Sequence, residues 1–333
     1  MTTIKDISKA VNVSTATVSH VINNSRYVSE ETRQRVLEAI EKLNYQPSAV
    51  ARGLRTKRTN TLAMIIPDIT NPYFSDFTRG FQDAADEKGY LVVLCNTDHL
   101  LDREIRFLEK MCQQRVEGIV LNPSQVTAKD LKRIVKAIPI VLIGSQFNQN
   151  EFDKVMIDNV RGGQDAVQYL YDLGHRRIGL SCGLRTTSSS ILRYQGYLQA
   201  LYKNAIPLDE NLVVEDEITY DGGYHSTRQL LSLPNPPTAI FATSDIMALG
   251  SKAAIEDFGL RIPDDVSLIG FDDIPDVSRT RPKLTTISQP KAQMGKVAAD
   301  LLFRQIESNN TLPKQKIVLK HNLVVRETTS ICP

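Results

Sequence analysis

The chain has 333 residues, of which 41% are hydrophobic and 23% are charged, and its formal net charge at pH 7 is +2. This length exceeds one ordinary hydrophobic core and predicts two or three folding units. No apolar run approaches the ~18 residues of a membrane-spanning helix, and residues 1–10 lack the apolar stretch of a secretory signal, so we expect a cytoplasmic protein without membrane contact.

Charge and cysteines are unevenly distributed along the chain. Residues 1–58 contain ten Lys and Arg against five Asp and Glu, whereas the remainder is slightly acidic. A small basic module joined to an acidic body favours a polyanion binder with a separate sensing or assembly domain. The four cysteines, Cys95, Cys112, Cys182 and Cys332, lack metal-ligand spacing, which favours buried thiols in a reducing cytosol and no bound metal.

Two short helices with a tight connection are predicted at the N-terminus. Thr3 can cap a helix over residues 4–10, with Asp6 at the position of a capping box. Ser14 can cap the next helix, because its hydroxyl can accept the backbone N–H of Thr17. This spacing is typical of a helix-turn-helix, and an ordinary helical hairpin packed into a larger core is the alternative.

The second of these helices has two different faces. Val18, Val21 and Ile22 give one narrow buried stripe. The opposite face carries short, mostly polar side chains, namely Thr15, Ala16, Ser19 and His20. Such a face can approach another molecule closely.

A third helix and a basic segment complete the N-terminal part. We expect Ser29 to cap the third helix and Asn44 to end it. Residues 48–58 carry four positive charges, and Gly53 disfavours a helix that is stable alone. The segment is either a solvated basic linker or a hinge that folds on DNA, with Leu54 wedged between base pairs.

From Thr61 onward, short apolar runs alternate with helical periods. Eight strand-like runs occupy residues 62–66, 91–95, 118–121, 140–143, 177–182, 212–214, 239–243 and 267–271. Intervening helices are expected to end at Gly89, Gly174 and Gly259. This alternation predicts two similar α/β subdomains with parallel sheets, and a ligand between them at the carboxyl ends of the strands.

Eight further segments carry recognisable motifs, namely residues 3–7, 11–23, 28–33, 44–52, 69–74, 243–250, 270–273 and 284–287. In this order they resemble the lactose/galactose repressor (LacI/GalR) family, and the N-terminal part is most similar to the purine and ribose repressors. The resemblance implies a helix-turn-helix headpiece (1–46), a hinge (47–59) and a core (60–333) that folds like periplasmic sugar-binding proteins. Within the core it implies an N-lobe of about 60–158 and 290–320, and a C-lobe of about 159–289 and 321–330, with crossovers near Asp158, Gln289 and His321.

The resemblance also implies that the chain is a transcriptional regulator, in the first place a repressor. Two copies would bind a near-palindromic DNA operator. No heptad helix follows residues 323–326, so a homodimer is expected rather than the tetramer known from the lactose repressor.

Family contacts, carried onto matching positions, imply which residues touch DNA. Thr15, Ala16 and His20 would read base edges. Phosphate-positioning side chains would be Thr17, Ser19, Asn24, Arg26 and Tyr27, with Leu54 and Arg55 acting in the hinge. Each of these could instead be a helix cap or a solvated surface side chain.

The same resemblance implies an effector site between the lobes. Its residues would be Tyr73, Phe74, Arg193, Ser244 and Asp272. The alternatives are helix core for the aromatic residues and an interlobe ion pair for Arg193 and Asp272. Gly144 replaces an aspartate of the purine and ribose types, and Ile218 replaces an aromatic lid, so a sugar or sugar derivative is favoured over a purine or nucleoside corepressor.

Two other function classes are alternatives to this interpretation. A sugar enzyme would need a nucleophile–base pair or a nucleotide-binding loop, and the chain contains neither a GxGxxG after a strand, a GxxxxGK[ST] nor an HExxH. A transport binding protein would have a signal peptide and no use for a basic headpiece. We therefore predict no catalytic residue, no cofactor and no metal site.

Overall fold

The computed structural model describes residues 2–45, 58–144, 147 and 151–332. The chain divides after Thr59 into two compact units, which we call the headpiece and the core. Leu54, Arg55 and most of the expected hinge lie outside the described residues. Among the described residues, no helix combines the length and the hydrophobicity that a membrane crossing requires.

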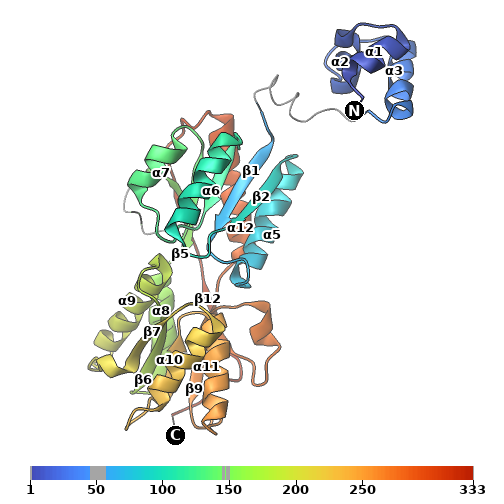
Figure 1. Cartoon of the computed structure of the whole chain (residues 1–333). Helices are drawn as coiled ribbons and strands as arrows, with labels where there is room; N and C mark the ends of the chain where they lie inside the picture. The colour runs from blue at the N-terminus through green and yellow to red at the C-terminus, as the bar shows by residue number, and fades with distance from the viewer. Residues whose placement is uncertain (1, 46–57, 145–146, 148–150, 333) are drawn as a thin grey trace. The chain divides into compact units, whose positions relative to one another are not determined.

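The described residues of the headpiece form a bundle of three helices around a small aliphatic core (Figure 1). Its helices are α1 (Ile4–Val11), α2 (Thr15–Asn23) and α3 (Glu30–Lys42). The predicted cap of α2 is confirmed, since the Thr17 N–H donates to the Ser14 hydroxyl at 3.0 Å. The Asp6 carboxylate accepts the Thr3 N–H at 2.8 Å, as expected for a capping box. The connections after α1 and α2 pass through left-handed Asn12 and Asn24, with φ of 53° and 48°.

The prediction for the start of α3 is only partly right. Ser29 stands at the N-cap, but it makes no side-chain capping bond. Its hydroxyl donates instead to the Thr32 hydroxyl at 2.9 Å. Glu30 and Glu31 in the first turn still favour this helix end, because their charge complements the helix dipole.

The core contains two six-stranded sheets, one in each lobe (Figure 1). The N-lobe sheet has the order β11-β5-β4-β3-β1-β2 and is parallel throughout. The C-lobe sheet has the order β12-β10-β9-β8-β6-β7, in which only the β10–β12 pair is antiparallel. The N-lobe strands are β1 (Thr61–Ile66), β2 (Leu91–Asn96), β3 (Gly118–Leu121), β4 (Ile140–Ile143), β5 (Asp153–Ile157) and β11 (Lys316–Leu319). The C-lobe strands are β6 (Ile178–Gly183), β7 (Val213–Asp216), β8 (Ala239–Ala242), β9 (Ser267–Asp272), β10 (Thr285–Ser288) and β12 (Asn322–Val324).

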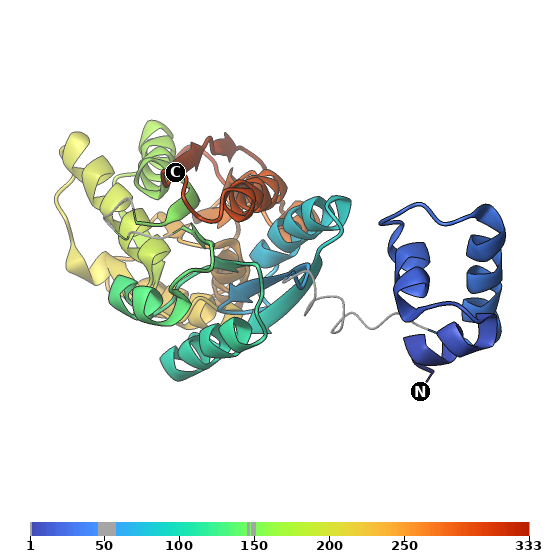
Figure 2. The ribbon, with the colours of Figure 1, turned by 90° about the horizontal axis from the view of Figure 1, so that it is seen from above.

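Helices cover both faces of each sheet, which is why the central strands are apolar throughout. In the N-lobe, α5 (Tyr73–Glu87) and α12 (Lys291–Glu307) lie side by side on one face (Figures 1 and 2), and α6 (Leu101–Gln113) and α7 (Ala128–Val135) cover the other. In the C-lobe, α8 (Asn159–Asp172) and α9 (Ser188–Lys203) cover one face, and α10 (Tyr220–Leu231) and α11 (Asp245–Asp257) the other. Two short 3-10 helices, Glu210–Leu212 and Pro275–Ser278, complete the C-lobe. The predicted fold class is confirmed.

The chain passes from one sheet to the other three times. The passages follow β5, β10 and β11, next to Asp158, Gln289 and His321. The apolar runs of the sequence indicated four strands in each subdomain, and each sheet has two more. The added strands include β11 and β12, which are only half buried and therefore lack a continuous apolar signature.

Local signals in the core give mixed results. Gly89, Gly174 and Gly259 adopt φ of 73°, 96° and 72°, so the predicted glycine helix stops are confirmed. All four cysteines are free thiols, but only Cys95 and Cys182 are buried. The expectation of buried thiols is wrong for Cys112 and Cys332, which are partly exposed. Cys112 lies near the end of α6, and Cys332 lies next to the last residue.

Candidate functional site

The outward face of α2 carries the residues expected to read bases. Val18 and Val21 are 0% and 4% exposed and turn toward the headpiece core. Thr15 and Ala16 are exposed, whereas Thr17, Ser19 and His20 are half-buried. The short side chains therefore share one accessible surface at the N-terminal end of the helix.

Local hydrogen bonds orient this surface. The His20 Nδ1 lies 2.9 Å from the Ser25 hydroxyl oxygen, and the Ser25 N–H donates to the His20 carbonyl at 3.2 Å. This contact engages Nδ1 of the imidazole and so restrains the ring. Thr17 is engaged locally as well, because its hydroxyl lies 2.8 Å from that of Ser14. Its backbone and hydroxyl thus support the helix cap.

The loop after α2 supplies the other predicted contacts. Asn24, Arg26 and Tyr27 are exposed, and Tyr27 keeps 94% of its surface accessible. The Asn24 side-chain oxygen accepts both ends of the Arg33 guanidinium, at 3.1 and 3.0 Å. Sequence reasoning missed Arg33, because a fork between a loop and α3 has no local signature. Asn24 therefore has a structural role besides any contact with a ligand.

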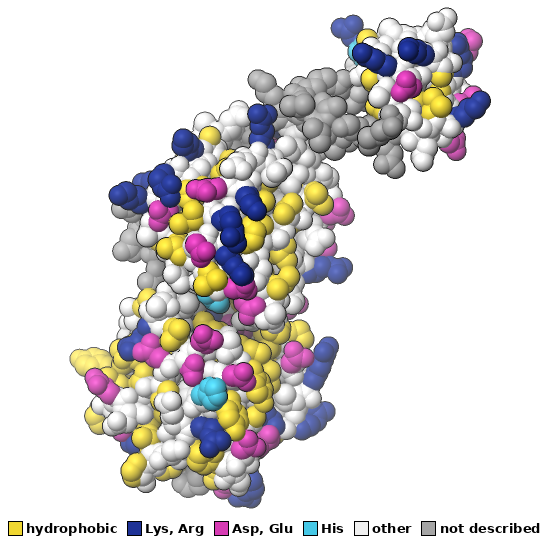
Figure 3. Space-filling view, in the orientation of Figure 1, with side chains coloured by type: hydrophobic (Ala, Val, Ile, Leu, Met, Phe, Trp, Pro, Cys, Tyr) yellow, Lys and Arg dark blue, Asp and Glu magenta, His cyan; other side chains and the backbone are white. Residues whose placement is uncertain are grey.

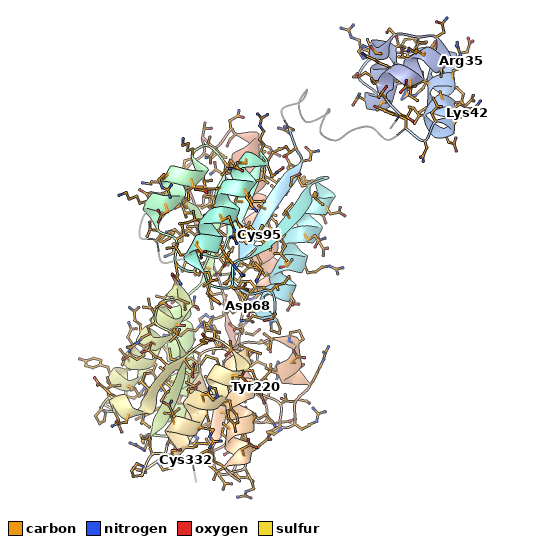
Figure 4. The ribbon with its side chains drawn as sticks, in the orientation of Figure 1. Arg35, Lys42, Asp68, Cys95, Tyr220 and Cys332 are labelled. Atoms are coloured by element: carbon orange, nitrogen blue, oxygen red, sulfur yellow. The ribbon has the colours of Figure 1, made fainter. Side chains whose placement is uncertain are left out.

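Positive charge is distributed over the headpiece surface. Figure 3 shows several Lys and Arg side chains on its visible face, with acidic side chains among them. Arg35 and Lys42 belong to α3, where Figure 4 labels them. Arg35 also donates to the Val11 carbonyl at 2.7 Å and so joins α3 to the end of α1.

Within the core, one pocket collects all five predicted effector residues. It encloses about 810 Å³, part of which is open to solvent, and both lobes line it. The predicted residues in its wall are Tyr73, Phe74, Arg193, Ser244 and Asp272. Gly144 and Ile218, the two departures from the family pattern, line it as well. Gly144 adopts φ +62°, and a Cβ there would meet nothing nearer than the Asn122 side-chain nitrogen at 3.9 Å, so this part of the pocket is open.

Arg193 and Asp272, which both line the pocket, form a buried ion pair. The Arg193 Nη2 lies 3.1 Å from the Asp272 Oδ1, and the two residues are 7% and 4% exposed. Arg193 also donates from Nε to the Asn159 side-chain oxygen at 2.9 Å and from Nη1 to the Thr243 carbonyl at 2.5 Å. Its guanidinium lies 3.6 Å from the centre of the Phe271 ring. These contacts fix its orientation while using three of its five N–H donors.

The ion pair lies within one lobe, contrary to the alternative stated for it. Arg193 belongs to α9 and Asp272 ends β9, both of the C-lobe. The bond therefore does not join the lobes by itself. A contact between the lobes comes from Lys291 at the start of α12, which donates to the carbonyls of Asp272 and Asp273 at 2.7 Å each.

The backbone around Asp272 is in an uncommon conformation. Asp272 and Asp273 have φ of 120° and 56°, both in the region that L-residues rarely adopt. Their carboxylates have different partners, since Asp273 pairs with Arg326 at 2.6 Å. The Asp272 Oδ1 accepts from Arg193 and, at 2.7 Å, from the Gln289 amide. Both bonds use the same oxygen, and no hydrogen bond to Oδ2 is found among the described residues.

A second buried carboxyl, that of Asp245, lies near enough to feel the charge of Asp272. Asp245 is 0% exposed, and burial together with the neighbouring Asp272 charge raises its pKa to about 7. It accepts the Ile274 N–H at 2.9 Å and the Thr286 hydroxyl at 2.7 Å. Burial also raises the pKa of Asp272, and the cations of Arg193 and Lys291 oppose that rise. Because Asp272 is the carboxyl that contacts Arg193, we place the negative charge on Asp272 and the proton on Asp245.

The aromatic side of the pocket is formed at the start of α5. The Tyr73 and Phe74 rings meet edge to face, with centroids 5.0 Å apart and planes at 83°. Burial and the Asp272 charge raise the pKa of Tyr73, so its hydroxyl stays protonated and can donate. Ser244 is 3% exposed and caps α11, its hydroxyl accepting the Met247 N–H at 3.4 Å.

Sequence reasoning missed several residues of the pocket. Asp68, which Figure 4 labels in the N-lobe near the C-lobe, follows β1. His99 follows β2, and Ser124 follows β3. All three lie just beyond the carboxyl ends of parallel strands, which is the signal that could have found them. Among the described residues, no group of His, Cys, Asp and Glu is arranged to hold a metal ion.

Two family models match the chain. Residues 3–48 match bacterial regulatory proteins of the lacI family, and residues 167–329 match the periplasmic binding protein-like domain. Catabolite control protein A of Priestia megaterium is 37% identical over 98% of this chain and 99% of its own. The ribose operon repressor of Escherichia coli is also 37% identical, over the same shares of the two chains.

Solved structures extend the similarity to the fold. The lac repressor dimer bound to operator and the anti-inducer ONPF superposes with a TM-score of 0.88 at 28% identity, covering 99% of both chains. A lacI family regulator from Enterococcus faecium with bound ribose has a TM-score of 0.74 at 30% identity, over 81% of this chain and 99% of that one. These relatives are regulators rather than enzymes, which agrees with the prediction of no catalytic role.

Proposed function

The chain belongs to the lacI family of bacterial regulatory proteins, and from this we propose that it is a cytoplasmic transcriptional repressor that acts as a homodimer. Each headpiece inserts α2 into the major groove of one half of a near-palindromic operator. The core takes up a small, neutral, sugar-like effector between its lobes. The observation that carries the proposal is the capped α2 with its short-chained accessible face, in a chain whose relatives over nearly their full length are regulators.

The chemistry of the α2 face supports base recognition. Thr15 and Ala16 offer a hydroxyl and a methyl group without bulk, so the helix can approach base edges closely. His20 offers its Nε2 edge while Ser25 engages Nδ1. Arg26 and Tyr27 are exposed beyond the helix and fit phosphate contacts, which set the register without reading sequence.

The DNA-binding part is tested by selecting duplexes from a random library with the full chain and measuring binding by fluorescence anisotropy. The selected sites are expected to be near-palindromic, and the affinity to fall steeply with salt, because bound phosphates release counterions. His20→Ala should change the selected base preference, whereas Gln34→Ala, on the exposed side of α3, should not. Unchanged affinity and preference in the His20 variant would remove α2 as the recognition element.

The pocket chemistry supports a neutral polyol as effector. Arg193 keeps two unused N–H donors, and Asp272 keeps one carboxylate oxygen, so a pair of sugar hydroxyls can bridge them. The positive charge of Arg193 is already compensated by Asp272, which disfavours a phosphate at this point. Tyr73 and Phe74 provide an apolar surface for the C–H face of a sugar ring.

The effector part is tested by thermal-shift screening and calorimetry on the full chain. A specific ligand raises the melting temperature by mass action. Sugars should raise the melting temperature, and Asp272→Ala should weaken the binding of any sugar that raises it. Stabilisation by purines or nucleosides alone would favour the alternative corepressor, and equal sugar affinity in both proteins would exclude this pocket.

A further inference from the structure

The side chain that follows α2 is held by a residue of α3. Asn24 comes directly after the last residue of α2 and adopts φ 48° and ψ 38°, in the left-handed region. Its N–H and that of Ser25 donate to the carbonyls of Val21 and His20, at 3.4 and 3.2 Å, and so close the helix. The backbone of Asn24 is therefore fixed to the end of α2, whereas its side chain is exposed.

Arg33, near the start of α3, decides which atom of the Asn24 amide is left for another molecule. It is half-buried, and its Nη1 and Nη2 both donate to the Asn24 Oδ1, at 3.1 and 3.0 Å. A guanidinium has five N–H donors and no acceptor, so the amide can meet it only with its oxygen. The Asn24 Nδ2, which carries two N–H donors, has no hydrogen-bond partner among the described residues.

The chemistry of this pair suits an anionic oxygen. Two amide N–H donors lie next to the positive charge of Arg33, and no carboxylate pairs with that charge within the described parts of the headpiece. Phosphate oxygens of DNA accept such donors, and the nearby cation strengthens the attraction. The reverse orientation of the amide would present its oxygen to the phosphate and repel it. The fork therefore selects the orientation that binds DNA.

From these contacts we infer that Arg33 is a positioning residue for DNA binding, which orients the Asn24 amide so that its N–H donors bind a backbone phosphate. This inference rests on the proposed docking of α2 and specifies how the end of that helix is anchored. A bond from the amide to a phosphate carries no sequence information. The pair thus contributes affinity and register, and base preference stays with the residues of the α2 face.

The test uses the full chain, the duplex that the wild type selects from a random library, and an unrelated duplex of equal length. Binding is measured by fluorescence anisotropy. Arg33→Met should weaken binding to both duplexes about tenfold, because the exposed amide must then be ordered on binding in each of two headpieces. Lys42→Met is the matched control, since it removes an equal charge from an exposed position of the same helix.

A double variant shows whether Arg33 acts through Asn24. Glycine tolerates the left-handed backbone of Asn24, so Asn24→Gly removes the amide and keeps the end of α2. In the Asn24→Gly background, Arg33→Met should have no more effect than Lys42→Met. A second tenfold loss in that background would overturn the inference, because Arg33 would then act on DNA or on the fold by itself.

Asn24→Asp separates a DNA contact from a merely structural fork. A carboxylate accepts from Arg33 at least as well as the amide oxygen does, so the melting temperature should not fall below that of the wild type. The carboxylate has no N–H donor and repels a phosphate, so binding to both duplexes should fall at least as far as in Asn24→Gly. Wild-type affinity in this variant would overturn the inference, since the amide donors would be unnecessary.

Base preference distinguishes this inference from the proposed function. Arg33→Met and Asn24→Gly should leave the selected base pairs unchanged, whereas His20→Ala should change them. A changed preference in either fork variant would overturn the inference while the docking of α2 stands. If the wild type selects no duplex, both the inference and the proposed docking are overturned.

Discussion

Replacement of Asp272 by asparagine probes the electrostatics of the buried pair. Removing one partner of a buried ion pair typically costs about 3–5 kcal/mol, because the other charge is left uncompensated. Arg193 would keep its bonds to Asn159 and Thr243 and its position over Phe271. We therefore expect a loss near the lower limit, about 3 kcal/mol in the free energy of unfolding.

The loss should depend on pH through Asp245. Burial and the Asp272 charge raise the pKa of Asp245 from 3.8 in the unfolded chain to about 7. Its contribution to stability is therefore complete at low pH and is lost as the pH rises through 7. In the Asp272→Asn variant the Asp272 charge is absent, so the pKa of Asp245 is lower than in the wild type. Between pH 6 and 8, the titration of Asp245 therefore lowers the free energy of unfolding of the wild type but not that of the variant. The penalty of the variant should thus be smaller at pH 8 than at pH 6, by about 1 kcal/mol.

Urea unfolding followed by circular dichroism at the two pH values measures both quantities. Asp245→Asn is the control, because it removes the titrating group and should flatten the pH dependence of the otherwise wild-type protein. An Asp272→Asn penalty that is the same at pH 6 and pH 8 would refute the assignment of the proton to Asp245 and the negative charge to Asp272. A penalty well below 1 kcal/mol would refute the buried pair itself.

Two further predictions concern buried groups outside this pair. Glu104→Gln should lower the free energy of unfolding by about 2–4 kcal/mol, because the amide replaces an acceptor oxygen that faces N–H donors. The control is Glu109→Gln, which is exposed on the same helix and should have almost no effect in the same urea titration. His175 is 0% exposed and burial lowers its pKa, so its neutral form stabilises the fold and stability should fall as the pH drops below about 6.5. His175→Gln should reduce this fall in thermal melts between pH 7 and 5, and an unreduced fall would show that other groups cause it.

The sequence by itself determined the local structure and the family. Ser14 specifies the start of α2 because its cap needs only a backbone N–H three residues away. Gly89, Gly174 and Gly259 mark helix ends because left-handed backbone is favourable for glycine. The central strands could also be predicted from the sequence, because burial on both faces requires a continuous apolar run. Such signals are local, and they survive without knowledge of the tertiary structure.

Family motifs also indicated which residues would meet in the pocket. Tyr73, Arg193 and Asp272 are far apart in the sequence, and the resemblance alone connected them. The structure brings them into one pocket, but it places the ion pair within the C-lobe rather than between the lobes. Arg193 and Asp272 share a lobe because α9 and β9 both lie between the crossings next to Asp158 and Gln289.

Only the tertiary structure decided the roles of the buried polar groups. Glu104 looks like an exposed helix residue in the sequence, yet it is fully buried and holds a loop about twenty residues away. Arg33 and Asn24 form a fork across nine positions, and Asp245 shares its environment with Asp272. A polar residue in the sequence predicts exposure, because burial without partners is unfavourable. Whether partners exist depends on which distant segments pack against it, and that information is carried by the assembled fold rather than by any local pattern.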